Sequence, residues 1–480
     1  MNWTDIMPAT PEIALLSLIC GVLVADLFVD ENRRVVTYWL SLASLAIVGV
    51  LLVATAPESP TLVFAGSYVS DSLSQLLKLA SVILVGLSFV YARHYLTENG
   101  LLKGEFFTLG MFGLLGMMIM MSSNGLMTMY LGLETLALSQ YSLVAIDRNS
   151  KVSAESAMKY FVLGAIASGS LLYGISWTYG VTGSLQFHDI AAAIQANPGM
   201  NGVALWFGIA FMLVGIGFKF GAVPFHMWLP DVYQGARTPV TLYLVAAPKL
   251  AAVALIIRIL ADGLGSIHEV WASMVLVLAV LSLVIGNVVA IAQSNIKRML
   301  AYSTIGHVGF ILAAVLCGTT TGYAAALYYA ITYVIMAAGS FAMVILLSRK
   351  GYEAENISDF KGLNARSPWF AIMMLFFMFG LAGVPPWVGF FAKLYSINAV
   401  LDAGYPALAV LMVLASVVGA FYYLRVVWYM YFDQPQDRSV LQSNLETRFA
   451  LSINGLAVLA LGILPGWLLQ LCVEVFARNP

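Results

Sequence analysis

Long apolar stretches recur along the whole chain, and short polar segments separate them. Each stretch holds about 20 residues, the length of a helix that crosses the hydrocarbon core of a bilayer. Two stretches, 203–234 and 367–401, are too long for one straight helix and contain Gly and Pro, so we expect a broken helix near Pro224 and another near Pro385. The pattern predicts fourteen membrane-spanning helices, over residues 11–29, 36–55, 71–92, 105–122, 125–146, 154–179, 203–234, 239–261, 270–292, 297–317, 322–348, 367–401, 406–432 and 450–473.

Composition agrees with residence in a membrane. The chain is 61% hydrophobic and 10% charged, whereas a soluble protein is about 25% charged. Mean hydropathy is +0.89. These values predict an all-α integral membrane protein in contact with the lipid bilayer.

Charge and ligand-type residues argue against several other classes of function. The net charge of −1 provides no basic patch for nucleic acid. Cys20, Cys317 and Cys472 lie far apart and form no CxxC pair, and the five histidines are equally scattered. This spacing argues against a zinc, iron–sulfur or haem site and against a disulfide framework.

Basic residues predict the orientation of the helices. When the predicted helices are followed in alternation, one side collects fifteen Lys and Arg residues and the other collects Arg478 alone. Because Lys and Arg accumulate in cytoplasmic loops, we expect both termini to be periplasmic in a bacterial inner membrane. The fifteen residues are Arg33, Arg34, Arg93, Lys103, Arg148, Lys151, Arg237, Lys297, Arg298, Arg349, Lys350, Lys361, Arg366, Arg438 and Arg448.

The remaining basic residues fall inside predicted helices. A charge at the centre of such a helix costs roughly 2.5–3.5 kcal/mol, so ionisable residues there are functional candidates by default. Glu134, Lys219, Lys249 and Lys393 are the strongest candidates, because each has at least one helical turn of apolar residues on both sides.

Five other charged residues have competing interpretations. Lys78 and Arg258 lie near the outer ends of their helices, and we expect them to extend toward the interface. Arg425 either has a function or bonds a backbone carbonyl and anchors a helix pair. Glu155 and Lys159 are four residues apart on one helix face, where they form a structural ion pair or take part in function.

The two predicted broken helices share a pattern, FKFGAVPFHMW around Pro224 and FGLAGVPPWVGFF around Pro385. An odd number of helices lies between them, so the two segments cross in opposite directions. This predicts two inverted five-helix repeats, 105–262 and 263–432, and broken helices at matching positions of such repeats indicate ion or substrate sites. Three helices (1–104) would precede the repeats, and a loop with a last helix (433–480) would follow them.

Proton binding and release is the chemistry that these residues support. The sequence has no Walker loop, GxGxxG loop or nucleophile elbow. A lysine in water keeps its proton at neutral pH, and burial makes the proton easier to release. Moving a proton against a membrane potential costs about 2.3 kcal/mol per 100 mV. No motif in the chain supplies that energy, so an external source is expected.

The motifs GFKFGAVPFHMWLPDVYQGARTPVT, AAPKLAAV, SNIKRMLAYSTIGHVGF and GLAGVPPWVGFFAKLY resemble the antiporter-like subunits of respiratory complex I, the proton-translocating NADH:quinone oxidoreductase. The resemblance covers about residues 105 to 432 and implies fourteen helices with two inverted five-helix repeats. Within that family, the end of the chain soon after the last predicted helix is unlike subunit L. By the same resemblance, subunit M has a glutamate at the twelfth-helix position where this chain has Lys393.

The resemblance also implies roles for individual residues. Secondary candidates are Glu155, His307, Lys297 and Arg425. The proton relay would consist of Glu134 as the fifth-helix glutamate, Lys159 in the sixth helix, Lys219 as the seventh-helix lysine, Lys249 as the connecting lysine of the eighth and Lys393 as the terminal lysine of the twelfth.

By the same resemblance, the chain is part of an enzyme but binds no cofactor or metal itself. NADH, FMN, iron–sulfur clusters and quinone would be bound by other subunits. The expected neighbours are the paralogous antiporter-like subunit M and the small membrane subunits J and K.

Other functions remain open on sequence alone. A subunit of a multi-subunit Na⁺/H⁺ antiporter, or of a related membrane-bound hydrogenase, would have similar buried lysines. Co-purifying flavin and iron–sulfur subunits would distinguish complex I from these. A purely structural assembly subunit is a third possibility, and it predicts that charge-removing substitutions lower assembly and pumping together.

Overall fold

The computed structural model describes residues 6–30, 33–197, 199, 202–435, 441 and 444–477. Two of the basic residues used above to predict orientation, Arg438 and Arg478, lie outside this part of the chain. The first described elements are a 3₁₀ turn (Met7–Ala9), α2 (Thr10–Leu27), α3 (Val35–Ala54), the antiparallel hairpin of β1 (Thr61–Val63) and β2 (Tyr68–Ser70), and α4 (Ser72–Glu98).

The next group of helices is α5 (Gly104–Met121), α6 (Leu126–Val144), α7 (Lys151–Thr182), α8 (Phe187–Ala196), α9 (Val203–Phe220), α10 (Trp228–Gly235), α11 (Thr238–Val245) and α12 (Ala247–Ile257), which continues as a π-helical turn (Arg258–Gly263). After a 3₁₀ turn (Gly265–Ile267) come α13 (His268–Ile291), α14 (Ile296–Leu316) and α15 (Thr320–Leu347). The last elements are a 3₁₀ turn (Ile357–Phe360), α16 (Leu363–Arg366), α17 (Pro368–Ala382), α18 (Val388–Asp402), α19 (Pro406–Phe432), α20 (Leu445–Ile463) and α21 (Pro465–Ala477).

Twelve of the described helical segments are long and apolar enough to cross a membrane. The fourteen predicted stretches include two that are not among these twelve. Stretch 125–146 forms α6, and stretch 367–401 forms the shorter helices α17 and α18. The chain is therefore an all-helical, multi-span membrane protein.

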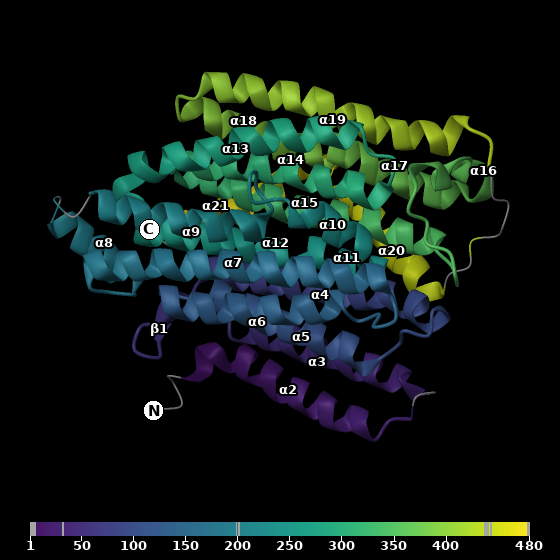
Figure 1. The fold of residues 1–480 in the computed structure, drawn as a ribbon, viewed down its shortest axis with the longest axis horizontal. Coiled ribbons are helices and arrows are strands. Elements are labelled where there is room, and N and C mark those ends of the chain that lie inside the picture. Colours follow the sequence, from purple (N-terminus) through teal and green to yellow (C-terminus); the bar gives the residue numbers. More distant parts are fainter. Residues whose placement is uncertain are drawn as a thin grey trace.

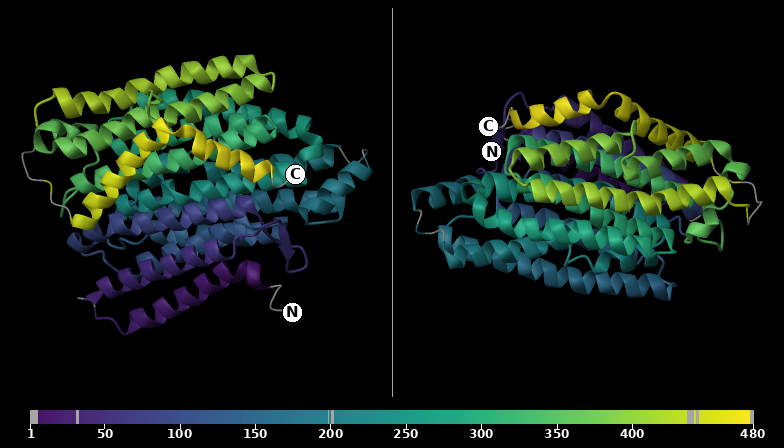
Figure 2. Two further views of the ribbon diagram at one scale, coloured as in Figure 1. Left: turned by 180° about the vertical axis from the view of Figure 1, so that it is seen from behind. Right: turned by 90° about the horizontal axis from the view of Figure 1, so that it is seen from above.

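The long helices lie side by side along one axis of the molecule (Figure 1). Helix α2 forms one edge of this bundle, and α18 and α19 form the opposite edge. Helices α20 and α21 cross the back of the bundle, and α7 runs along its front (Figure 2). We call the end that carries Lys151, Lys297 and Arg298 the basic end, and the described ends of the chain both lie at the other end.

The core of the bundle is formed by three segments in which 94% of the most apolar 18-residue part is buried inside the protein, namely Thr238–Gly263, Ile296–Leu316 and Thr320–Leu347. Helices at the periphery, such as α20, are buried over only 33% of their most apolar part. Their exposed surface is apolar, as a lipid-facing surface must be.

Two helices break at the predicted places. Helix α9 ends at Phe220 before Gly221, and α17 ends at Ala382 before Gly383. Both glycines have a left-handed conformation, with φ of 74° and 84°. Glycine adopts this conformation at little cost and ends helices for that reason.

Two further interruptions fall where the sequence pattern predicts single helices. Segment 239–261 is interrupted at Ala246, two residues before Pro248, and segment 450–473 is interrupted between Ile463 and Pro465. Proline lacks an N–H group and clashes with the carbonyl four residues earlier, so it ends or kinks a helix. The sequence pattern predicted neither interruption, although Thr238–Gly263 is still one candidate membrane span as expected.

Lys78 and Arg258 are buried and paired and do not extend to the interface as expected. Lys78 Nζ lies 2.5 Å from a carboxylate oxygen of Glu12 in α2. Arg258 Nη2 lies 2.7 Å from Asp71, the N-cap of α4, and also donates to the carbonyl of Met121 at 3.2 Å. The expectation failed because these carboxylates belong to other helices, which a pattern within one helix cannot reveal.

Replacing Arg258 by Ala is expected to destabilise the chain strongly. Asp71 is only 3% exposed, and leaving a buried charge without its partner costs about 3–5 kcal/mol. The measurement is the amount of folded chain that survives mild-detergent extraction and its melting temperature. Arg448→Ala is the control, because Arg448 is exposed. Equal behaviour of the two variants would contradict this account of the Arg258 ion pair.

Candidate functional site

Two buried lysines donate hydrogen bonds to the ends of the broken helices. Lys249 Nζ donates to the carbonyl of Phe220 at 2.7 Å, and Lys393 Nζ donates to the carbonyl of Ala382 at 2.7 Å. Phe220 and Ala382 are the last residues of α9 and α17. The last carbonyls of a helix have no partner within it, and the partial negative charge there attracts a cation.

Local features of the sequence position both lysine amines near these helix ends. Lys249 follows the Ala246 interruption and is the third residue of α12, which packs against α9. Lys393 lies in α18 and reaches back toward the end of α17. A Cβ atom at Gly383 would lie 2.8 Å from Cδ of Lys393. Glycine at this position therefore permits both the left-handed backbone and the close approach of the lysine.

Lys219 has a different environment. It lies one residue before the end of α9, and its buried amine has no hydrogen-bond partner in the described part of the chain. Nζ lies 5.9 Å from the centroid of the Tyr141 ring and 6.0 Å from that of Phe218. Aromatic faces attract a cation at such distances without accepting its proton.

Glu134 lies on the face of α6 that also carries Tyr141, because residues seven apart are separated by about two turns. The Ser168 hydroxyl of α7 donates a hydrogen bond to the Glu134 carboxylate. Among the ion pairs of the described residues, none joins Glu134 to Lys219. Tyr141 therefore lies on the same face of α6 as Glu134, and its ring faces the Lys219 amine.

A small cavity of about 20 Å³ lies between Lys219 and Lys249. Gln140, Tyr160 and Trp228 also line it, and the Tyr160 hydroxyl donates to Oε1 of Gln140 at 2.7 Å. The volume has room for at least one water molecule. These two lysines are therefore the members of the predicted relay that share a cavity.

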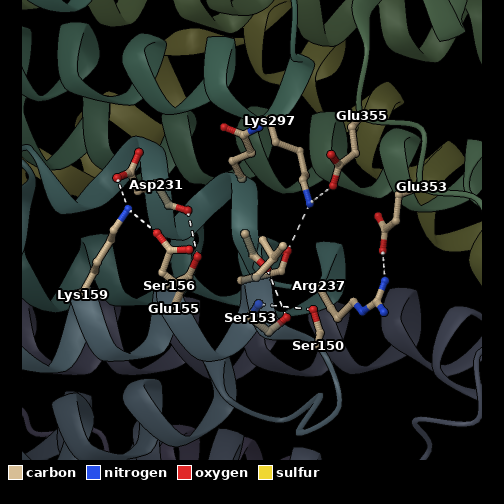
Figure 3. A pocket seen from close by; sticks show the side chains of 14 residues that line it. Ser150, Ser153, Glu155, Ser156, Lys159, Asp231, Arg237, Lys297, Glu353 and Glu355 are labelled. Atoms are coloured by element: carbon tan, nitrogen blue, oxygen red, sulfur yellow. Dashed lines mark hydrogen bonds and ion pairs between the residues drawn. The ribbon is translucent and has the colours of Figure 1, made fainter.

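A larger polar cavity of about 480 Å³ lies at the basic end (Figure 3). Lys159 Nζ lies 2.9 Å from Glu155 and 3.0 Å from Asp231. Lys297 Nζ lies 2.9 Å from Glu355. The Glu155–Lys159 pair is thus an ion pair at the mouth of this cavity, with the lysine side chain 44% exposed.

Stacked aromatic rings line the smaller cavity. The Tyr160 and Trp228 rings are nearly parallel, with centroids 4.5 Å apart, and the Trp228 indole donates to the carbonyl of Phe218 at 2.9 Å. Lys159 lines the larger cavity, and its neighbour Tyr160 lines the smaller one. Helix α7 therefore leads from one cavity to the other.

Three secondary candidates also have defined partners. Arg425 donates to the carbonyls of Ile291 at 3.0 Å and Gln293 at 2.6 Å, at the end of α13, which agrees with the carbonyl-bonding interpretation. Lys297 also donates to the carbonyl of Ala236 at 3.1 Å, just after α10. His307 is buried among tyrosines.

The sequence did not predict Asp231, Gln140 and Tyr160 as site residues. Asp231 carried a usable signal, because it is an acidic residue inside the predicted stretch 203–234. Gln140 and Tyr160 carried no such signal, because uncharged polar residues are common in membrane helices. Their hydrogen bond joins two separate helices, so no pattern within one helix indicates it.

The chain is similar to known membrane subunits along almost its whole length. Residues 123–419 match the family described as "NADH:quinone oxidoreductase/Mrp antiporter, TM". A protein of Thioalkalivibrio sulfidiphilus named NADH-quinone oxidoreductase subunit N is 55% identical over 468 residues, which cover 97% of each chain.

Chains of two solved membrane complexes are also similar to this chain. A chain of respiratory complex I from Thermus thermophilus, solved with bound aureothin, has a TM-score of 0.83 and is 30% identical over 97% of this chain and 100% of its own. A chain of the Mrp complex from Dietzia sp. DQ12-45-1b has a TM-score of 0.86 and is 21% identical over 100% of this chain and 98% of its own. At that identity, the second similarity concerns the fold alone.

The two lysines that line the larger cavity are expected to differ in their effect on stability. Lys159→Ala removes two partly exposed ion pairs, with Glu155 and Asp231, and should change the free energy of unfolding by no more than about 1 kcal/mol. Lys297 is 1% exposed, and Lys297→Ala should cost about 1–3 kcal/mol because the carbonyl of Ala236 loses its donor. Thermal melting in mild detergent measures both variants, and a larger loss for Lys159→Ala would contradict the assignment.

Proposed function

The chain belongs to the NADH:quinone oxidoreductase/Mrp antiporter family of membrane proteins, and we propose that it is the antiporter-like subunit N of a NADH:quinone oxidoreductase. The carrying observation is the 55% identity, over 97% of both chains, to a protein of that name. In this role the chain translocates protons, while the redox chemistry takes place in other subunits.

The proposed relay consists of the five residues named from the sequence, with Lys219 and Lys249 at its centre. These two amines share a cavity next to the broken helix α9. An amine bonded to a helix-end carbonyl keeps a donor whether it is neutral or charged. The negative helix end favours the charged form, so Lys249 and Lys393 have sites that stabilise an arriving proton.

We infer that protons reach the relay from the basic end. The cavity there is polar and carries Lys159, Glu155 and Asp231 at its mouth. The stacked rings of Tyr160 and Trp228 line the lysine cavity, and Tyr160 follows Lys159 directly in α7. Glu134, held by Ser168, provides a negative charge near Lys219 that can bias its proton affinity.

The proposed architecture has fourteen membrane-spanning helices, with α6 and the α17–α18 pair crossing in addition to the twelve long segments. Two isolated backbone bridges support the inverted repeats 105–262 and 263–432. Gly125 pairs with Gln186, and Asn295 pairs with Asn356. Both members of the second bridge lie 170 residues after those of the first, so the two halves use the same contact.

Arginine contacts give the same spacing. Arg258 donates to the carbonyl of Met121, the last residue of α5, and Arg425 donates to that of Ile291, the last residue of α13. These two carbonyls are also 170 residues apart. Corresponding helix ends in the two proposed repeats are thus bonded by an arginine from near the end of each repeat.

This assignment also specifies which subunits bind the cofactors, which subunits are the neighbours of this chain, and how the chain is oriented in the membrane. NADH, FMN, iron–sulfur clusters and quinone are bound by other subunits, and this chain binds neither cofactor nor metal. The paralogous subunit M and the small subunits J and K are its membrane neighbours. The basic end faces the cytoplasm, and both termini are periplasmic in the bacterial inner membrane.

The second candidate function is a subunit of a multi-subunit Na⁺/H⁺ antiporter. The matched family includes Mrp antiporters in its description, which supports this candidate. The higher identity to proteins named subunit N and to a complex I chain favours the first candidate.

Purification of the tagged chain in mild detergent distinguishes the two candidates. We expect a large complex with flavin and iron–sulfur absorption that reduces quinone with NADH. Preparations from an untagged strain control for contaminating enzyme. A small preparation without redox centres that exchanges Na⁺ for protons in vesicles would contradict the proposed function.

A further inference from the structure

Glu353 lines the polar cavity at the basic end, and the relay described above does not use it. It lies in the connection that follows α15, outside the membrane-spanning segments. Lys159 and Glu353 lie at opposite sides of the cavity (Figure 3). The Glu353 side chain is only 16% exposed, so this side of the cavity holds a carboxyl group that is largely withdrawn from water.

Three donors from two other segments hold the Glu353 carboxyl group. The hydroxyl of Tyr95 in α4 donates to Oε1, and the hydroxyl of Thr238, the first residue of α11, donates to Oε2 at 2.6 Å. Arg237 Nη1 lies 3.4 Å from Oε1. The carboxyl group therefore has a fixed position between the connection after α15, the end of α4 and the start of α11.

Arg237 is shared unequally between two carboxylates. Its Nε and Nη2 atoms donate to Oδ2 of Asp147 at 2.9 Å and 2.6 Å, whereas Glu353 has the single contact at 3.4 Å. One guanidinium carries one positive charge, so it cannot balance two largely buried carboxylates. A carboxylate with a like charge nearby takes up a proton more readily. Because its contact with Arg237 is the weaker one, Glu353 is the member of this pair that is poised to do so.

The other charged neighbours do not supply the missing positive charge. Glu355 lies two residues further along the same connection, and its carboxylate pairs with Lys297 Nζ of α14 at 2.9 Å. Burial raises the pKa of the Glu353 carboxyl group to about 8, and the charge of Glu355 adds to the increase. A group with such a pKa exchanges protons with water near neutral pH, as an efficient proton carrier must.

The site can hold Glu353 with or without the proton. A hydroxyl group can donate or accept a hydrogen bond. The ionised carboxylate accepts from Tyr95 and Thr238, and the protonated acid can donate to either of these hydroxyl oxygens. Arg237 keeps its two bonds to Asp147 in both states. Proton uptake therefore does not require the cluster to come apart.

We propose that Glu353 is a second proton-uptake group of the polar cavity, an inference that rests on the proposed function. Its carboxylate takes one proton from a hydronium ion or a buffer acid at the basic end and forms one O–H bond. It then gives a proton to water in the cavity and becomes a carboxylate again, so one proton enters and one leaves. Lys159 serves the side of the cavity at α7, and Glu353 serves the opposite side.

The test measures the initial rate of NADH-driven proton pumping by the assembled complex in proteoliposomes, per complex, as a function of pH. An uptake group matters most where protons are scarce. For Glu353→Gln we expect a rate within about twofold of the unmodified complex at about pH 6.5 and a loss of at least several-fold at about pH 8.5. Glu105→Gln is the matched control, because Glu105 is an exposed carboxylate at the start of α5, at the same end.

Thr238→Val tests the same group without removing it. A hydrogen bond to a carboxylate favours its charged form, so loss of the Thr238 hydroxyl should raise the pKa of Glu353. Pumping by the unmodified complex should decline above about pH 8, and in Thr238→Val this decline should move upward by about one pH unit. This variant serves if Glu353→Gln does not assemble. An unchanged profile in Thr238→Val would overturn the proposal.

Lys219→Ala separates this inference from the proposed function. If Lys219→Ala abolishes pumping while Glu353→Gln has the pH profile of the unmodified complex, the uptake role is overturned and the relay stands. If Lys219→Ala pumps normally, the proposed function fails, and the uptake role fails with it. An equal loss at both pH values in Glu353→Gln would show a structural role, and an equal loss in Glu105→Gln would show a general effect of surface charge. Either result would also overturn the proposal.

Discussion

A helix that ends inside an apolar interior leaves carbonyl groups that need donors, and this constraint governs where cations lie in the molecule. Five buried or partly buried cations donate to a carbonyl at the end of a helix. The pairs are Lys249 with Phe220, Lys393 with Ala382, Lys297 with Ala236, Arg258 with Met121 and Arg425 with Ile291. A cation in such a place satisfies the helix end, and the helix end offsets part of the cost of burying the charge. Broken helices and buried cations therefore occur together.

The same constraint distinguishes the lysines of the proposed relay from one another. Lys249 and Lys393 have a carbonyl partner that remains when the proton leaves, whereas Lys219 has aromatic rings around it and no hydrogen-bond partner in the described part of the chain. Lys159 is partly exposed between two carboxylates at the mouth of a polar cavity. These three kinds of environment suit different tasks, namely uptake at Lys159, a switch at Lys219 under the influence of Glu134, and storage at the two helix ends.

Sequence alone predicted the membrane class, the two glycine-terminated breaks and the deep charged residues, because each depends on local composition within one stretch. It did not predict the interruption at Ala246, although Pro248 was visible, since the stretch was short enough to be read as one helix. The hairpin after α3 and the short helix α8 were missed because they lie in the connections between predicted membrane helices and are too short to give a membrane-spanning pattern. Partners such as Glu12 for Lys78 or Tyr423 for His307 join helices far apart in sequence, and no pattern along one helix reveals them.

The most direct test of this account compares Lys393→Gln with Lys393→Met in the assembled complex, by the number of protons moved per quinone reduced. Glutamine keeps a neutral donor for the carbonyl of Ala382 but cannot carry a proton at neutral pH. We predict that Lys393→Gln assembles and reduces quinone while its pumping ratio falls at least several-fold, and that Lys393→Met assembles less well in addition. Normal pumping by Lys393→Gln would contradict the account, because it would show that this lysine serves the helix end and not the proton.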